Sequence, residues 1–312
     1  MKTRSPKTRS SGFTLIELMV SMGITAIIIT VLVTITGVAT DTWTRSRSQL
    51  RASRQAKVLI DTMAKDFESL VSRRGDNMEW MYVTMDSSAN LPQVVKSGSG
   101  NSNVASLTFF TAATDRYNGQ IGEAADAGGD VSCVAYRMRF QDPITGDTGD
   151  KDTSTFVFYR MLINPDETFE KLLGEEDLDT AFSSFENEVT SEENFICENV
   201  HQVTITFLVE VTREAGSGGS ATLETARVVL DSTSGGSEFR LKGSGIDLQN
   251  VEIGNGFTQD EIAAGRLTGV ELSVSVLSDA GMIRRNAADG LTDKDYARQS
   301  YHYSRVVDVP GG

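Results

Sequence analysis

Histidine and cysteine are scarce in this 312-residue chain, with two of each, and no motif of common enzyme chemistry makes up for them. The cysteines, Cys133 and Cys197, are too few for a disulfide scaffold, and their spacing does not suit a zinc knuckle. The histidines, His201 and His302, lie far apart in the sequence, and the chain lacks His-Glu-x-x-His, Gly-Lys-Ser/Thr phosphate-loop and Gly-x-Ser-x-Gly motifs. The sequence therefore predicts a protein that is not an enzyme and that holds no metal or cofactor.

Positive charge is also in short supply, since the formal net charge is −14. An acidic surface repels phosphate backbones, so no nucleic-acid partner is expected. Three acids, Asp147, Asp150 and Asp152, share one glycine-containing loop, which raises the question of calcium. Their spacing does not match an EF-hand, and we interpret the loop as a solvated acidic turn.

The segment from Leu18 to Thr40 has no charged residue at all. As a helix, these 23 residues would extend about 34 Å, enough to cross a hydrocarbon core of about 30 Å. Four cations and no acid lie in the ten residues at the N-terminus. A secretory signal peptide cleaved after Ala39 is the competing interpretation, although such peptides have apolar cores of about 7–15 residues.

The apolar segment is preceded by the run Gly12-Phe13-Thr14-Leu15-Ile16-Glu17. A carboxylate at the edge of an apolar span is costly unless it is protonated or paired, which marks Glu17 as a functional candidate. Together with the basic leader, this run resembles the processing site of type IV prepilins. The resemblance implies that a membrane peptidase cuts after Gly12 and methylates the new amine of Phe13. It also implies that Glu17 pairs with the N-terminal amine of a neighbouring subunit during filament assembly.

The same resemblance implies a location and a set of partners. The chain would be a single-pass protein of the bacterial inner membrane, with a cytoplasmic N-terminus and a periplasmic head. Its partners would be the prepilin peptidase, other minor and major pseudopilins, and the inner-membrane assembly platform. Basic residues alone do not decide the orientation, because five more cations follow the span: Arg45, Arg47, Arg51, Arg54 and Lys57.

An amphipathic pattern continues the helix beyond the span. Apolar residues recur at steps of three and four, which predicts a stripe that packs on a sheet: Ala52, Ala56, Leu59, Ile60, Met63, Phe67, Leu70 and Val71. Asp61, Lys65, Asp66 and Glu68 are expected on the other faces, and the helix is expected to end near Arg74. The predicted division is a basic leader at 1–12, a transmembrane or filament-core helix at 13–40, its amphipathic continuation at 41–75, and a β-rich periplasmic head at 76–312.

Strand patterns dominate the head. The expected strands are Val104–Ala112, Val131–Phe140, Ser154–Ile163, Val200–Thr212, Ala221–Asp231, Thr268–Ser278 and Tyr301–Val309. Two of them alternate apolar and polar residues, which is typical of antiparallel sheets with one wet face. Short helices are expected at Asn164-Pro165 and at Thr258, where Glu261 completes a capping box, and loops at Gln141–Thr153 and Ser232–Gly245. The predicted fold class is α+β, with a long pilin-like N-terminal helix, its first half transmembrane, packed on antiparallel β-sheets.

Parts of the head are similar to J-type minor pseudopilins of type II secretion systems. The similarity lies in Cys133-Val134-Ala135-Tyr136-Arg137, Phe158-Tyr159-Arg160 and Ser304-Arg305-Val306-Val307. The cysteines have two interpretations: a disulfide, which an oxidising compartment permits, or two buried thiols.

The function that this resemblance implies, together with the size of the head of about 237 residues after Gly75, is a structural, minor, tip-type pseudopilin of a type II secretion-like or type IV pilus-like machine. The alternative is a periplasmic binding or enzymatic domain with a conventional signal peptide or membrane anchor.

Overall fold

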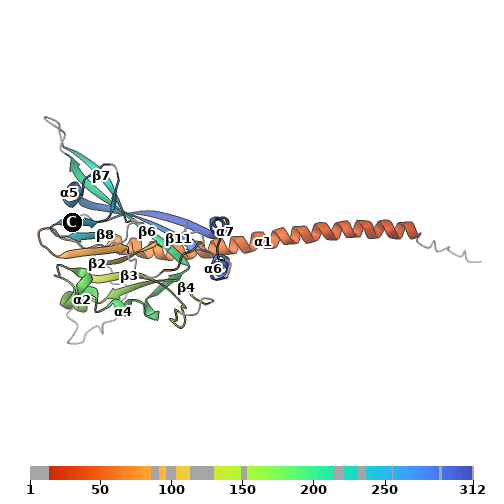
Figure 1. Ribbon diagram of the computed structural model, residues 1–312, viewed down its shortest axis with the longest axis horizontal. Helices are drawn as coiled ribbons and strands as arrows, with labels where there is room; N and C mark the ends of the chain where they lie inside the picture. The colour runs from red at the N-terminus through yellow and green to blue at the C-terminus, as the bar shows by residue number, and fades with distance from the viewer. Residues whose placement is uncertain are drawn as a thin grey trace, which may run out of the picture. The chain divides into compact units, whose positions relative to one another are not determined.

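The computed structural model describes residues 14–85, 91–95, 103–112, 130–148, 153–213, 221–230, 237–254, 256–287 and 290–310. The chain divides into two compact units, Met1–Ser48 and Gln49–Gly312, and the second is called the head unit below. Helix α1, Leu15–Glu68, contributes to both units (Figure 1). Its end at Glu68 comes six residues before the predicted end near Arg74.

Twelve described strands build the head unit in two antiparallel wings (Figure 1). The first wing has the order β9-β8-β1-β2-β3-β4-β5, with strands Gly245–Gln249, Glu238–Lys242, Glu79–Met85, Asn103–Thr111, Ser132–Gln141, Thr155–Ile163 and Phe195–Glu198. The second has the order β10-β7-β6-β11-β12, with strands Glu252–Ile253, Thr222–Val229, Val200–Arg213, Arg266–Leu277 and Ser300–Asp308. A short parallel pairing of β2 with β6 joins the wings.

Six short α-helices and one 3₁₀ turn complete the described head. They are α2 (Pro165–Lys171), α3 (Leu178–Phe182), α4 (Glu186–Val189), η1 (Glu192–Asn194), α5 (Gln259–Ala263), α6 (Asp279–Asn286) and α7 (Asp293–Gln299). Both predicted helix starts are confirmed. Pro165 occupies the first turn of α2, and Thr258 and Glu261 form the capping box of α5.

All seven predicted strands are present, within two residues at each end. The sequence did not predict β1, β5, β8, β9 and β10. The predicted loop Ser232–Gly245 is wrong in part, because it contains β8, where Phe239 and Leu241 alternate with charged residues. Five residues give too short an alternation to distinguish a strand from a loop by pattern alone.

One face of the sheet receives the apolar stripe of α1. Ala56, Leu59, Met63 and Phe67 are each at most 1% exposed. Phe67 stacks on Phe109 of β2 with ring centroids 4.6 Å apart. Each large side chain buried in this way contributes about 1.5–3 kcal/mol, so the stripe fixes this part of α1 to the head.

The other face of the first wing is covered by the segment between β4 and β5, which contains α2, α3, α4 and η1 and is called the cap below. Apolar cap residues pack against outward-facing strand residues: Leu172, Leu178, Phe182, Phe185 and Val189 against Trp80, Tyr82, Phe110, Cys133, Ala135, Val157 and Tyr159. Cover on both faces explains why β3 is buried at every position from Ser132 to Met138, and β4 at every position from Thr155 to Arg160. The wet face predicted by alternation is confirmed in β6 and β11, the two strands that carry the alternating pattern, where exposure alternates along the strand.

Asp66 is the main departure from the expected helix pattern. It was expected to face outward, but it is fully buried on the sheet side of α1. Two nitrogens of Arg160 on β4 donate to its two carboxylate oxygens, each at 2.7 Å, and the Tyr136 hydroxyl of β3 donates to the same carboxylate. A buried carboxylate is tolerated only when it is paired and hydrogen-bonded, and this one is satisfied on both oxygens.

A disulfide between the cysteines is not supported by the fold, since both are free and buried. Cys133 pairs with Ile163 of β4, whereas Cys197 pairs with Phe158 of the same strand. The two cysteines are therefore separated by two strand spacings, about 10 Å across the sheet, and by five residues, about 16 Å along the strands. A disulfide needs Cα atoms within about 7 Å. The interpretation that stands is two buried thiols, whose pKa values are raised by burial.

Replacing Asp66 by alanine is expected to destabilise the head by about 3–5 kcal/mol, because Arg160 would remain buried without its partner. The matched control is Asp61→Ala on the same helix, since Asp61 forms a half-exposed ion pair with Arg305 at 2.9 Å. That substitution should cost less than about 1 kcal/mol. The measurement is denaturant unfolding of the full chain in detergent, followed by Trp80 fluorescence in a Trp43→Phe background. Equal losses for both variants would contradict the buried-pair argument.

Candidate functional site

The first turn of α1 holds the one sequence-predicted assembly residue that lies within the described structure, Glu17. The predicted processing residues, Gly12 and Phe13, lie outside the described residues. Oε2 of Glu17 accepts hydrogen bonds from the Thr14 amide and the Thr14 hydroxyl, both at 2.9 Å. The Glu17 amide in turn donates to the Thr14 hydroxyl oxygen at 3.4 Å. Thr14 and Glu17 therefore form a reciprocal capping box at the start of the helix.

This capping box was missed in the sequence, although its signal was present. Thr14-Leu15-Ile16-Glu17 fits the Ser/Thr-x-x-Glu pattern that precedes an apolar run. One carboxylate oxygen of Glu17 is used within its own chain. Since an ionised carboxylate offers about four acceptor positions, capacity remains for a cation from outside.

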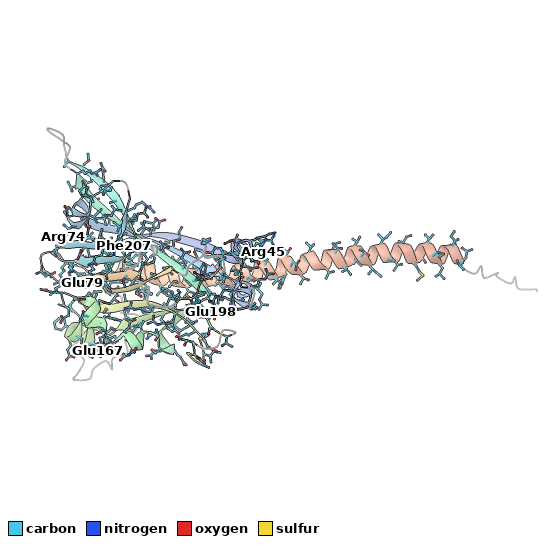
Figure 2. The ribbon with its side chains drawn as sticks, viewed as in Figure 1. Arg45, Arg74, Glu79, Glu167, Glu198 and Phe207 are labelled. Carbon is cyan, nitrogen blue, oxygen red and sulfur yellow. The ribbon has the colours of Figure 1, made fainter. Side chains whose placement is uncertain are left out.

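The helix that follows is long and apolar enough to cross a membrane, as judged by length and composition. Its first segment has exposed side chains throughout: from Leu15 to Val38 every large apolar residue is at least 50% exposed (Figure 2). Apolar surface of this extent is stable only when it is covered by lipid or by other apolar helices. The segment therefore fits a single-pass membrane anchor.

The threonine hydroxyls along this segment are hydrogen-bonded to the backbone of their own helix. Thr25, Thr30, Thr34, Thr36 and Thr40 each donate to the backbone carbonyl four residues earlier, at 2.8 or 2.9 Å. Unsatisfied donors are costly in lipid, and these bonds remove that cost without a partner helix. Gly23 and Gly37 have open space around them, since an added Cβ would meet nothing within 4 Å. Small glycine and threonine side chains allow another helix to pack closely against this segment.

The last third of α1 is attached to the head by two exposed ionic contacts in addition to Asp66. Near the start of the head unit, Arg51 binds Glu198 at 2.6 Å and Asp279 at 2.7 Å. At the other end, Arg305 of β12 binds Asp61 at 2.9 Å and Glu68 at 3.2 Å. The three head residues that bind α1 through an arginine or tyrosine side chain, Tyr136, Arg160 and Arg305, lie in the three head runs quoted in the sequence analysis. These runs therefore have a clear structural role in holding the helix.

The remaining candidates in the sequence are in structural positions. Nε2 of His201 contacts the Tyr296 hydroxyl at 3.1 Å, and burial lowers the pKa of His201 to about 3. Nδ1 of His302 lies 2.7 Å from the hydroxyl of Ser275, its direct cross-strand neighbour. Within the described residues no hydrogen bond joins either histidine to a carboxylate, so this serine–histidine contact lacks the third group of a nucleophilic triad. Two of the three loop acids, Asp150 and Asp152, lie outside the described residues.

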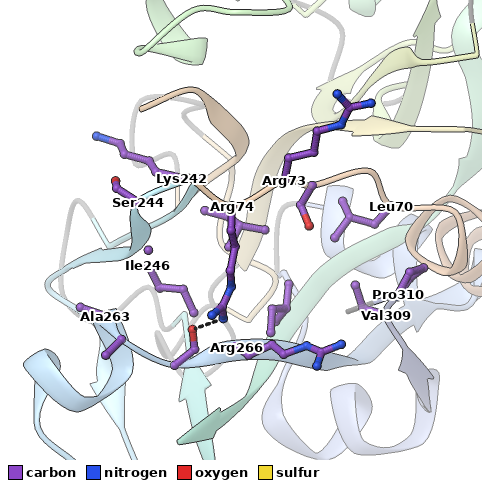
Figure 3. Close-up of a pocket in the computed structure, with 17 residues that line it drawn as sticks. Leu70, Arg73, Arg74, Lys242, Ser244, Ile246, Ala263, Arg266, Val309 and Pro310 are labelled. Atoms are coloured by element: carbon purple, nitrogen blue, oxygen red, sulfur yellow. Dashed lines mark hydrogen bonds between the residues drawn. The ribbon is translucent and has the colours of Figure 1, made fainter. Parts of the chain in front are cut away.

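A small basic pocket lies where the chain leaves α1 and meets the β8–β9 turn and the start of β11 (Figure 3). Its volume is about 90 Å³, and its lining includes the cations Arg73, Arg74, Lys242 and Arg266 but no carboxylate. Arg74 donates to the Gly265 carbonyl at 3.1 Å, which holds its guanidinium in place. The pocket brings together no pair of groups suited to acid–base or nucleophilic chemistry.

One of the comparisons with known proteins bears on the N-terminal segment. Residues 7–33 match the family model described as the prokaryotic N-terminal methylation motif. No curated protein matches the chain in sequence. Among solved structures, a type IV-like pilin from Thermus thermophilus is similar, with 8% identity, a TM-score of 0.31, and coverage of 83% of this chain and 97% of that one. That superposition is too loose to support an inference about the head. The methylation motif confirms the resemblance drawn from Gly12–Glu17: the N-terminal segment of this chain is type IV prepilin-like.

Proposed function

We propose that the chain is a structural, minor, tip-type pseudopilin of a type II secretion-like or type IV pilus-like machine, matured by a prepilin peptidase. The observation that carries the proposal is the methylation motif at residues 7–33, which includes Glu17 and much of the apolar part of helix α1. The proposed parts are the leader at 1–12, the membrane or filament-core helix at 13–40, its continuation at 41–75, and a periplasmic head at 76–312.

Processing supplies the cation that Glu17 lacks. In the uncut chain Phe13 is part of a peptide bond and has no amine, and the Glu17 carboxylate has no hydrogen-bond partner among the described residues other than Thr14 of its own turn. Cleavage after Gly12 creates a free amine at Phe13. In an apolar filament core, an amine and a carboxylate each need a partner, so the Phe13 amine of one subunit and Glu17 of a neighbour stabilise each other.

The partners that follow from this proposal are the prepilin peptidase, other minor and major pseudopilins, and the assembly platform in the inner membrane. Contacts would form first between apolar helices, through the hydroxyl- and glycine-bearing surface, and then between heads. The anchor would be single-pass, with the N-terminus in the cytoplasm, because that is where the leader meets its peptidase.

The size of the head supports a minor position. About 237 residues follow Gly75, and compactness scaling gives such a domain a radius of gyration of about 17–18 Å. Packed helices in a filament core lie about 8–10 Å apart. Heads of this width on every subunit would crowd one another along a closely spaced shaft, whereas a few copies at one end would not.

The first test of the proposal is the N-terminus of the mature protein. Mass spectrometry of membrane-extracted protein from cells with active peptidase should find N-methylated Phe13, and removal of the leader should change the formal charge from −14 to −18. Gly12→Ala should leave the leader attached. Cleavage after Ala39 would instead favour a conventional signal peptide and the alternative of a soluble periplasmic domain.

Substitution of Glu17 separates assembly from insertion. Glu17→Ala makes the span more apolar, so membrane insertion should be retained, but the neighbour's amine loses its partner and incorporation into filaments should fall at least tenfold. Thr14→Ala is the control, because it removes the capping hydroxyl and keeps the carboxylate. Quantitative blotting of sheared filaments against total membrane protein measures both variants. Normal incorporation of Glu17→Ala would refute the pairing.

The tip-type assignment predicts a low copy number. In purified filaments this chain should be present in substoichiometric amounts beside a smaller, dominant subunit. Quantitative mass spectrometry with isotope-labelled peptides of both subunits measures the ratio. If this chain is the dominant subunit, the minor assignment is wrong while the prepilin class stands.

A further inference from the structure

Five basic residues follow the apolar span, and they differ in whether their side chains form an ion pair with the head. Arg51 binds Glu198 and Asp279, as described above. Arg45, Arg47, Arg54 and Lys57 make no side-chain hydrogen bond or ion pair with any described residue. These four cations therefore take no part in attaching α1 to the head.

Two of these four cations lie close to the end of the uncharged segment. Arg45 and Arg47 come five and seven residues after Thr40, which is about 7.5 and 10.5 Å of helix. The headgroup layer of one leaflet is about 5–7 Å thick, and an arginine side chain can reach back several ångströms. Trp43, which is 71% exposed, lies about 4.5 Å beyond Thr40, at the depth where indole rings gather in membrane proteins.

The charge balance gives these two arginines a specific role. After removal of the leader, Glu17 and Asp41 cancel Arg45 and Arg47, so the whole excess of −18 belongs to the head unit. An anionic membrane surface repels a body of that charge. Arg45 and Arg47 are the only basic residues between the uncharged segment and the head unit. Asp41 is the nearest acid, and no described ion pair joins it to Arg45.

We propose that Trp43, Arg45 and Arg47 form an interfacial collar that binds anionic phospholipid headgroups in the leaflet from which the head emerges. The inference rests on the membrane-anchored part of the proposed function. A guanidinium can bind phosphate oxygens through two parallel hydrogen bonds, and the indole holds the helix at headgroup depth. The collar would concentrate anionic lipid around the subunit and offset the repulsion between that lipid and the acidic head before the subunit leaves the membrane.

The test uses the full-length mature protein in phosphatidylcholine vesicles that carry a trace of dansyl-labelled lipid. The chain has two tryptophans, so Trp80→Phe leaves Trp43 as the sole donor for energy transfer. Transfer to dansyl-phosphatidylglycerol is compared with transfer to dansyl-phosphatidylcholine. The expected ratio is several-fold above one at low salt, since each cation at a membrane surface is worth about a fivefold enrichment, and it should fall as salt is added.

The matched variants lie on the same helix. Arg45→Gln with Arg47→Gln should bring the ratio close to one. Arg54→Gln with Lys57→Gln removes the same charge from residues that also lack partners, but these lie 14 and 17 residues beyond Thr40, more than about 20 Å of helix. This second pair should leave the ratio unchanged. An unchanged ratio in the first pair, or an equal loss in both pairs, would overturn the collar.

Alkaline extraction of the vesicles distinguishes failure of the membrane anchor from failure of the collar. Every variant should remain in the membrane fraction, because the apolar segment is intact. Release of the unmodified protein would refute the membrane anchor, and the collar with it. Retention without a preference for phosphatidylglycerol would refute the collar and leave the anchor, the methylation motif and the filament proposal as they are.

Discussion

The buried carboxylate of Asp66 determines how helix and sheet fit together in the head. Moving a charged group out of water costs several kcal/mol, and this cost is recovered only if both oxygens find donors. Arg160 and Tyr136, on adjacent strands, supply them. Rotating the helix by one residue, or sliding it by one turn, would leave both Asp66 and Arg160 buried and unpaired. The apolar stripe provides the greater part of the contact area, but it would tolerate such shifts far better than the ion pair.

The first wing of the sheet is covered on both faces, by α1 on one and by the cap on the other, and the contacts on the two faces differ. One face receives α1 through an apolar stripe and the Asp66 pair. The other receives the cap, where Arg137 of β3 binds Glu186 of α4 and lies over the ring of Phe182, its guanidinium carbon 5.2 Å from the ring centroid. The strands between them are therefore protected from water on both sides. This gives the segment Gln49–Glu68 a rigid support.

Local patterns in the sequence were sufficient for the features that depend on neighbouring residues. The prepilin-type motif, the apolar stripe, seven strands and two helix starts are all local. The capping box of Thr14 and Glu17 was equally local and was overlooked. Asp66 was misplaced for a different reason: an acid among polar helix residues is normally solvated, and Arg160 lies 94 residues further along the chain. The cysteine positions depend on strand register, and α3 and α4, with five and four residues, are too short for a helical period to appear.

The three attachments of α1 to the head have a mechanical consequence. The attachments are spread along the last 18 residues of the helix, at Arg51, at Asp66 and at the two acids bound by Arg305. They therefore follow one another along the helix axis. A force that pulls along α1 must therefore shear the ionic contacts and the apolar stripe together, whereas a force that peels the helix away would break them one after another. Bonds loaded in parallel share the tension, so the head unit resists a force along this part of α1 better than a force that peels the helix away.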